Sequence, residues 1–214
     1  MNIVADIEQG TEEWKQLRLG KVTASRVADV VARTKTGWGA SRANYAAELI
    51  AERLTGTAAE RFTNDAMRWG SETEHLARLA YEFHADTEVT QVAFAYHPTI
   101  PMAGASPDGL VGHDGLVEIK CPNTATHIET LLGGSIPGKY EAQCQWQMAC
   151  TGRHWVDWVS FDPRLPEDMR LFVQRIARDD EAIASLEIEV AGFLVEIATK
   201  IDALVRAVAQ RRAA

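Results

Sequence analysis

A single α/β domain is the fold class that this 214-residue sequence predicts, on three observations. Apolar residues recur with helical spacing over residues 11–54 and again over residues 180–210. Segments with the alternation typical of strands fill much of the stretch between them. No internal repeat, low-complexity segment or linker divides the chain, and one domain is the usual expectation at this length.

The first part of the chain is expected to be helical. Thr11 is placed to cap a short helix that ends near Gly20, and Thr23-Ala-Ser25 opens a second helix. Residues 33–42 are interpreted as a basic, glycine-bearing loop, and residues 44–54 as a helix by periodicity.

The rest of the chain combines helices with strands. Ser71-Glu-Thr-Glu74 has the pattern of a capping box that leads into an amphipathic helix. The elements expected after it are a strand over 88–96, a hairpin around 112–115, a helix over 140–150, strands over 154–161 and 170–176, and a long amphipathic helix over 180–210, bent at Gly192. That last helix would either cover the protein's own core or contribute to a subunit interface.

Composition excludes some classes of protein. No apolar run approaches the roughly 20 residues that span a bilayer, and residues 1–10 lack the basic and apolar regions of a signal peptide. We therefore expect a cytoplasmic protein with no membrane partner. The three cysteines have no CxxC spacing, which favours small buried hydrophobic residues over zinc ligands or a disulfide framework.

The net charge of −8 is unevenly distributed. Residues 1–70 hold 10 Lys+Arg and 9 Asp+Glu, whereas residues 71–150 hold 3 and 10. A bound divalent cation would offset part of this local acidic excess. The overall charge therefore does not exclude a nucleic-acid partner.

The stretch SPDGLVGHDGLVEIKCP, residues 106–122, places three charged residues in a predicted hairpin. With residues 112–115 as the turn, Asp108 lies opposite Glu118, and side-chain alternation puts Lys120 on the same face. Two carboxylates this close repel each other unless a cation or a shared proton lies between them. Mg²⁺ accepts such oxygen ligands, and a neighbouring lysine can orient a water, so the triad suits metal-assisted phosphodiester hydrolysis. The alternative is an ordinary surface ion pair between Glu118 and Lys120.

The residues around this triad resemble a known family. SPDG followed by EIK resembles the PD-(D/E)xK nuclease motif, and the stretch from about Glu8 to about Asp180 resembles the lambda-exonuclease (YqaJ-type) viral recombination nucleases. The blocks that carry the resemblance, in the family's order, are EQGTEEWKQLRLGKVTAS, RWGSETE, SPDG, VEIKCP, LLGG, YEAQCQWQM and FDPR.

The resemblance implies a PD-(D/E)xK, restriction-endonuclease-like core, with a central mixed β-sheet flanked by helices and a long C-terminal helix. It implies one nuclease domain over residues 1–214, in which helices within 11–54 contribute a DNA-end pocket, residues of about 70–176 form the catalytic core and residues of about 180–210 form the last helix. The implied activity is processive, Mg²⁺-dependent 5′-to-3′ digestion of one strand of linear double-stranded DNA, which leaves 3′ overhangs for recombination by single-strand annealing. A homotrimeric ring, a single-strand annealing protein as partner, and a phage or prophage gene expressed in a bacterial host are implied with it.

The same resemblance gives roles to the triad. Asp108 and Glu118 would bind the metal together with the Ile119 backbone carbonyl, and Lys120 would position the attacking water. Glu74 would lie near a second metal ion, since two ions per site are implied, and the competing account of Glu74 is the capping box. Mn²⁺ in place of Mg²⁺ stays open, because both ions take oxygen ligands.

Tyr140 and Gln143 are one turn apart in a predicted helix and would, by the resemblance, act beside the scissile phosphate. Gln145 and Gln147 are expected to be solvated or to pack beside Trp146.

Three residues match the family's pocket for a 5′-terminal phosphate: Arg18, Ser25 and Ser106. A serine at a helix N-terminus and a forked guanidinium both favour an anion. Alternatively, Arg18 would pair with Glu12 or Glu13, and Ser25 would be only an N-cap.

Two further residues match positions of strand separation in the family. Met67 corresponds to an apolar wedge, although a lone methionine is more often a core residue. Lys35 stands where the family has an arginine, and it keeps the charge but not the fork.

Two other functions remain open from the sequence: a sequence-specific or structure-specific endonuclease on the same core, and a catalytically inactive DNA-binding module. The intact triad disfavours the inactive module.

Overall fold

The computed structural model describes residues 3–59 and 65–213, except for the side chain of Met67. Its α-helices are α1 (Glu12–Arg18), α2 (Val27–Val30), α3 (Ala40–Thr55), α4 (Asp65–Ala85), α5 (Thr124–Gly133), α6 (Glu141–Thr151) and α7 (Asp180–Ala213). Short 3₁₀ turns are η1 (Ala24–Arg26), η2 (Gly138–Tyr140) and η3 (Glu167–Met169). The strands are β1 (Ile3–Val4), β2 (Val22–Thr23), β3 (Arg33–Thr34), β4 (Gly37–Trp38), β5 (Val89–Thr90), β6 (Phe94–Tyr96), β7 (Ala103–Ala105), β8 (Gly109–Val111), β9 (Gly115–Lys120), β10 (Trp155–Phe161) and β11 (Leu171–Ala177).

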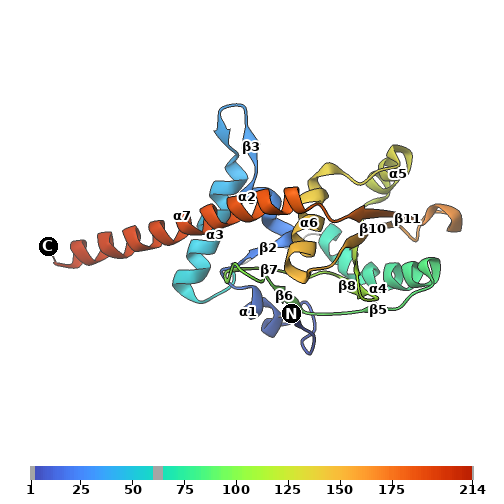
Figure 1. Cartoon of the computed structure of the whole chain (residues 1–214), viewed down its shortest axis with the longest axis horizontal. Helices are drawn as coiled ribbons and strands as arrows, with labels where there is room; N and C mark the ends of the chain where they lie inside the picture. The colour runs from blue at the N-terminus through green and yellow to red at the C-terminus, as the bar shows by residue number, and fades with distance from the viewer. Residues whose placement is uncertain (1–2, 60–64, 214) are drawn as a thin grey trace.

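The strands form two mixed sheets and a small hairpin (Figure 1). The five-stranded sheet has the order β11-β10-β9-β8-β5, with β9 and β10 parallel and the other neighbours antiparallel. The four-stranded sheet has the order β1-β6-β7-β2, with β2 and β7 parallel. The predicted mixed α/β fold with a long C-terminal helix is confirmed, and its strands are divided between two sheets.

Helices cover both faces of the five-stranded sheet, so side chains of β9 are buried whichever way they point. On one face, Leu116 of β9 shares a cluster with residues of α6 and α7, including Met148 and Ile183. On the other face, Val117 and Ile119 pack with Ala77 and Tyr81 of α4. Because side chains alternate along a strand, Glu118 points to the same face as Leu116, toward α6.

The predicted capping box at Ser71-Glu-Thr-Glu74 is wrong. Helix α4 begins at Asp65, so Ser71 and Glu74 lie in its interior. The capping pattern depends only on local spacing, whereas the helix is also stabilised by burying Ala77 and Tyr81 against the sheet.

Other local predictions also need correction. Residues 33–38 form the β3–β4 hairpin instead of a loop, and the Arg33 guanidinium lies 3.5 Å from the centre of the Trp38 ring across it. The predicted strand over 88–96 is two strands, β5 and β6, which belong to different sheets. The helix expected to open at Thr23-Ala-Ser25 is the short turn η1 followed by four residues of α2.

Helix α7 is continuous over 34 residues, without an interruption at Gly192. Its first half packs on the core through five buried residues, Ile183, Leu186, Val190, Phe193 and Ile197. Its last part extends beyond the body of the molecule, as Figure 1 shows at the C-terminus. None of the helices in the described residues is long and apolar enough to cross a membrane.

The cysteines behave as the sequence analysis expects. Cys144 and Cys150 are buried, Cys121 is partly buried, and all three are free thiols. Burial raises the pKa of the Cys121 thiol to about 12, and Glu74 and Asp108 add to this shift.

Candidate active site

The β8–β9 hairpin has the register that the sequence predicts. Leu110 pairs with Leu116, and Gly109 pairs with Val117. Asp108 directly precedes β8, and its Oδ2 atom accepts a hydrogen bond from the Ile119 backbone N–H at 2.6 Å. This bond holds the Asp108 carboxylate beside the part of β9 that carries Glu118.

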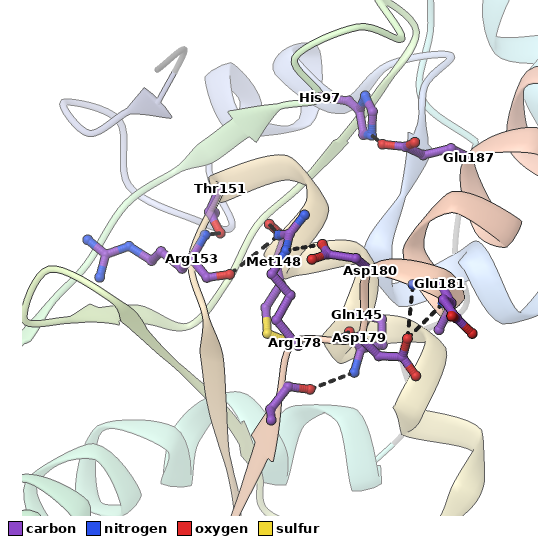
Figure 2. A network of polar contacts seen from close by, with 12 residues as sticks. His97, Gln145, Met148, Thr151, Arg153, Arg178, Asp179, Asp180, Glu181 and Glu187 are labelled. Atoms are coloured by element: carbon purple, nitrogen blue, oxygen red, sulfur yellow. Dashed lines mark hydrogen bonds and ion pairs between the residues drawn. The ribbon is translucent and has the colours of Figure 1, made fainter.

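Arginine side chains fix the hairpin turn relative to α6. The Nη1 atom of Arg153 donates to three backbone carbonyl oxygens around the turn, those of Val111, Gly112 and Gly115. Arg178 donates to the carbonyl oxygens of Met148 in α6 and of Arg153, which Figure 2 shows beside the start of α7. The strand that carries Glu118 and the segment that ends α6 are therefore joined by partly buried and exposed hydrogen bonds.

Glu118 lies at the centre of the candidate site, and only 2% of it is exposed. Its Oε1 atom pairs with Lys120 Nζ and accepts a hydrogen bond from Gln143 Nε2 at 2.5 Å. Its Oε2 atom accepts a hydrogen bond from Gln147 Nε2 at 2.5 Å. A buried charge is tolerated where it is both paired and hydrogen-bonded, and Glu118 meets both conditions.

The expectation that Gln145 and Gln147 are solvated or only pack beside Trp146 is wrong. Gln147 is fully buried, and it shares with Gln143 the face of α6 that points to Glu118. Gln145 is buried on another side, where it donates to the Ala177 carbonyl and accepts from the Asp179 N–H, both at 2.9 Å (Figure 2). The spacing of four residues between Gln143 and Gln147 is the signal in the sequence that could have found Gln147.

The acidic groups shift one another's pKa. Burial and the nearby Glu118 carboxylate raise the pKa of Asp108 well above its ordinary value, although Lys120 opposes the shift. Burial alone would lower the pKa of Lys120, but Glu118 and Asp108 outweigh burial and raise it, so the side chain is an ammonium group. The protein alone therefore does not fully balance the two carboxylates.

A hard divalent cation fits this donor set. Two carboxylates, Asp108 and Glu118, meet beside the Ile119 backbone, and oxygen atoms of this kind are the ligands of Mg²⁺. The raised pKa of Asp108 indicates negative charge that a cation would compensate. No group of three His, Cys, Asp or Glu side chains within residues 3–59 and 65–213 is arranged as a metal site, so further ligands would be backbone, water or substrate oxygens.

Glu74 approaches this cluster from α4. Its Oε1 atom lies 3.6 Å from Arg78 Nη1, one turn along the helix. Burial raises the pKa of Glu74, Arg78 opposes the shift, and Glu118 adds to it. The glutamate is therefore electrostatically linked to the acids on β9.

Tyr140 lies at the end of η2, directly before α6. Its ring centre is 5.4 Å from Lys120 Nζ and 5.4 Å from the centre of the Trp158 ring. Gln143 and Lys120 both contact the Oε1 atom of Glu118, and the Tyr140 ring lies beside Lys120.

Of the three residues matched to a phosphate pocket, two are in contact. Arg18 Nη1 donates to Ser106 Oγ at 3.0 Å, and Trp14 Nε1 donates to the same oxygen at 3.0 Å. Because Ser106 is two residues before Asp108, this contact joins α1 to the active-site strand. A cavity of about 400 Å³ opens beside Arg18, and the sequence analysis missed two lysines in its lining, Lys15 and Lys21.

Ser25 differs from its predicted setting. It is an exposed residue in the middle of η1, and its Oγ atom lies 3.5 Å from Thr23 Oγ1. The expectation that Ser25 caps a helix is wrong, because the element is a three-residue turn that starts at Ala24. The physical argument from a helix N-terminus therefore no longer supports Ser25.

The structure places one of the two residues matched to strand separation, Lys35, and this residue lies outside the cluster. Lys35 is exposed at the tip of the β3–β4 hairpin, which projects from the body in Figure 1. Met67 belongs to the first turns of α4, and its side chain lies outside the described part of the chain.

The chain is similar to several known proteins. A family model for the YqaJ-like viral recombinase domain matches residues 13–154. An alkaline exonuclease from Laribacter hongkongensis has a similar structure, with 56% sequence identity, a TM-score of 0.87 and coverage of 94% of this chain and 99% of that chain. A structure of the same exonuclease in complex with dAMP gives a TM-score of 0.88 at the same identity and coverage.

A phage-related exonuclease from Haemophilus somnus 129PT, at 16% identity, has a TM-score of 0.69 over 89% of this chain and 99% of that chain, which shows the shared fold. No curated protein sequence matches significantly. The family model covers most of the chain, including the β8–β9 hairpin and α6, and the protein accordingly belongs to the YqaJ-like viral recombinase domain family.

Proposed function

We propose that this protein is a Mg²⁺-dependent 5′-to-3′ exonuclease that processively digests the 5′-ended strand of linear double-stranded DNA. It leaves 3′ single-stranded overhangs for phage-type recombination by single-strand annealing. The observation that carries the proposal is the buried Glu118 carboxylate, which lies beside Asp108 and is contacted by Lys120 and two glutamines. Family membership and the 56% identity to an alkaline exonuclease support nuclease activity in recombination.

Asp108, Glu118 and the Ile119 carbonyl would hold one Mg²⁺, and Glu74 would contribute near a second; Mn²⁺ could replace either. When bound, the ions would polarise the scissile phosphate and neutralise its developing charge. The proposed role of Lys120 is to orient the attacking water with its ammonium group, which Glu118 holds in place.

Tyr140 and Gln143 are proposed to contact the scissile phosphate, because the Tyr140 ring lies 5.4 Å from Lys120 Nζ and Gln143 donates to the Glu118 oxygen that pairs with Lys120. Arg18 and Ser106 are proposed to bind the 5′-terminal phosphate, and Ser25 is added to them on the resemblance alone. The support is the hydrogen bond between Arg18 and Ser106, two residues from the metal ligand Asp108.

The remaining parts of the proposal rest on the resemblance alone. Residues 1–214 would form one nuclease domain, and three copies would form a ring around DNA in the cytoplasm of a bacterial host. Met67 and Lys35 would help to separate the strands, and a single-strand annealing protein would bind the exposed 3′ strand.

The test is digestion of linear duplex labelled at either the 5′ or the 3′ end, with and without Mg²⁺. We expect early release of the 5′ label only when Mg²⁺ is present, and no release of label from the Asp108→Asn variant. Cleavage of covalently closed circles would instead identify an endonuclease on the same core. Binding of duplex ends without any cleavage would identify an inactive binding module.

A further inference from the structure

Arg164 joins three elements at the edge of the sheet where the parallel strands β9 and β10 end. It belongs to the FDPR stretch, residues 161–164, which directly follows the β10 residue that pairs with Lys120. Its guanidinium donates to both carboxylate oxygens of Asp162, from Nε at 2.7 Å and from Nη2 at 2.9 Å. The same Nη2 atom donates to the Pro122 carbonyl oxygen at 3.2 Å. One side chain therefore holds the end of β10 to the chain just past β9.

The third element is helix α4. The Cζ atom of Arg164 lies 4.3 Å from the centre of the Trp69 ring, in the first turns of α4. The Asp162 carboxylate is fully buried, and its two bonds to Nε and Nη2 fix the plane of the guanidinium. The guanidinium therefore offers the indole a flat face at a set place, and Trp69 is tied to the end of β10.

Helix α4 has a second attachment to the same strand. The Tyr81 hydroxyl donates to Asp157 Oδ2 at 2.7 Å, near the start of β10. Trp69 and Tyr81 are 12 residues apart, which is about 18 Å along a helix. Asp157 and Asp162 are five residues apart, which is about 17 Å along a strand. Because the two spacings match, α4 runs antiparallel along β10, and the two attachments together fix its position along the strand.

Glu74 lies between these attachments. It is five residues from Trp69, which is about 7.5 Å along the helix. A similar distance back along β10 from Asp162 is about two residues and reaches Ser160. The partner of Ser160 on β9 is Lys120. The attachment at the end of β10 therefore keeps Glu74 level with the charged end of β9.

We propose that Arg164 is a positioning residue, which holds α4 through Trp69 and thereby keeps the Glu74 carboxylate beside that of Glu118. This inference rests on the proposed function, because the role of Glu74 near a second metal ion belongs to it. The charge of Arg164 is balanced by Asp162, so its role differs from that of an arginine that binds a phosphate.

The test is calorimetric titration of the metal-free protein with Mn²⁺. Arg164→Lys keeps the charge but loses the fork and the flat face. Trp69→Leu removes the ring and leaves the pair between Arg164 and Asp162 in place. We expect each variant to bind Mn²⁺ about tenfold more weakly at the weaker of the two sites, as loss of a group that orients a ligand implies. Trp69→Phe keeps an aromatic face and should bind Mn²⁺ like the wild type.

Arg175→Lys is the matched control. Arg175 makes the same kind of contacts nearer the start of β10, with two bonds of 2.8 Å to the buried Asp157 carboxylate. Its guanidinium lies 3.6 Å from the centre of the Trp155 ring. Loss of this fork should lower the melting temperature, as Arg164→Lys does, and leave Mn²⁺ binding unchanged.

A comparison with Glu74→Gln separates positioning from stability. In the Glu74→Gln background, Arg164→Lys should weaken Mn²⁺ binding no further, because it acts through the carboxylate that is already lost. Additive losses, or equal effects of Arg164→Lys and Arg175→Lys, would overturn the proposal.

The same titrations distinguish this proposal from the proposed function. If Glu74→Gln weakened Mn²⁺ binding and neither Arg164→Lys nor Trp69→Leu did, the positioning role would fail and the metal role of Glu74 would stand. If Glu74→Gln left Mn²⁺ binding unchanged, both roles would fail together. A protein that bound Mn²⁺ as expected but digested no duplex would contradict the proposed activity and support the positioning role.

Discussion

Replacing Gln147 by methionine tests whether the buried glutamine holds Glu118 in place. Gln147 Nε2 donates to Glu118 Oε2 at 2.5 Å, while the other oxygen of Glu118 has its own partners, Lys120 and Gln143. Methionine keeps the length of the side chain and its helix propensity, and it removes only the polar atoms. The variant therefore leaves one oxygen of a buried carboxylate without a donor.

The size of the effect follows from two opposing contributions. A hydrogen bond to a charged group contributes about 1.5–3 kcal/mol. Gln147 Oε1, however, has no hydrogen-bond partner within the described residues, and a buried unpaired oxygen destabilises the folded protein. Removing this oxygen stabilises the variant by about 1 kcal/mol and so offsets part of the loss. We expect the free energy of unfolding to fall by roughly 0.5–2 kcal/mol, and the melting temperature by roughly 1–8 °C at this chain length.

Two measurements separate this role from ordinary core packing. Urea denaturation without metal gives the loss of stability, and calorimetric titration with Mg²⁺ or Mn²⁺ gives the metal affinity. Loss of a group that orients a ligand typically weakens metal binding by about 10–100-fold. Gln145→Met is the control, because Gln145 is also a buried glutamine of α6 but bonds to Ala177 and Asp179; this variant should lose stability and keep its metal affinity. If Gln147→Met bound metal as tightly as the wild type, the inference that Gln147 orients Glu118 would be wrong.

Three further predictions concern the same site. Lys120→Met should abolish digestion of linear duplex and leave end binding largely intact in a gel-shift assay; unchanged turnover would remove the lysine from the mechanism. The folded protein raises the pKa of Asp108 above its value in the unfolded chain. Between these two pKa values the folded state keeps a proton that the unfolded chain releases. The stability that this proton contributes is therefore present at low pH and is lost as pH rises through the raised pKa. Metal-free urea midpoints should therefore fall as pH rises over that window, and Mg²⁺ should reduce the fall; a midpoint that rises with pH in the same window would contradict the raised pKa. Arg18→Ala should slow digestion of 5′-phosphoryl ends on the order of tenfold and bring their rate close to that of 5′-hydroxyl ends, as loss of one charged hydrogen bond implies; an unchanged ratio between the two ends would argue against a phosphate pocket at Arg18 and Ser106.

Local chemistry explains what the sequence could predict. The β8–β9 register follows from the position of the glycine-flanked turn and from the two-residue period of a strand, so the pairing of Leu110 with Leu116 was predictable. The cap of α1 by Thr11, which accepts from the Trp14 N–H, is equally local.

Tertiary packing explains what the sequence analysis missed. The true start of α4 depends on the burial of Ala77 and Tyr81 against the sheet, which no local pattern at Ser71 records. The contact between Gln147 and Glu118 depends on the packing of α6 against the face of β9 that carries Leu116, and the two residues are 29 positions apart.

The parallel pairing of β9 with β10 has a consequence for circular permutation of this chain. The chain leaves β9, passes through α5 and α6, and returns in β10, so residues 108–161 contain Asp108, Glu118, Lys120 and both glutamines that contact Glu118. A circularly permuted gene that opens the chain elsewhere would keep this segment in one piece. Such permutants would have their new termini outside this segment, while Glu74 of α4 and Arg18 of α1 would still come from the rest of the chain.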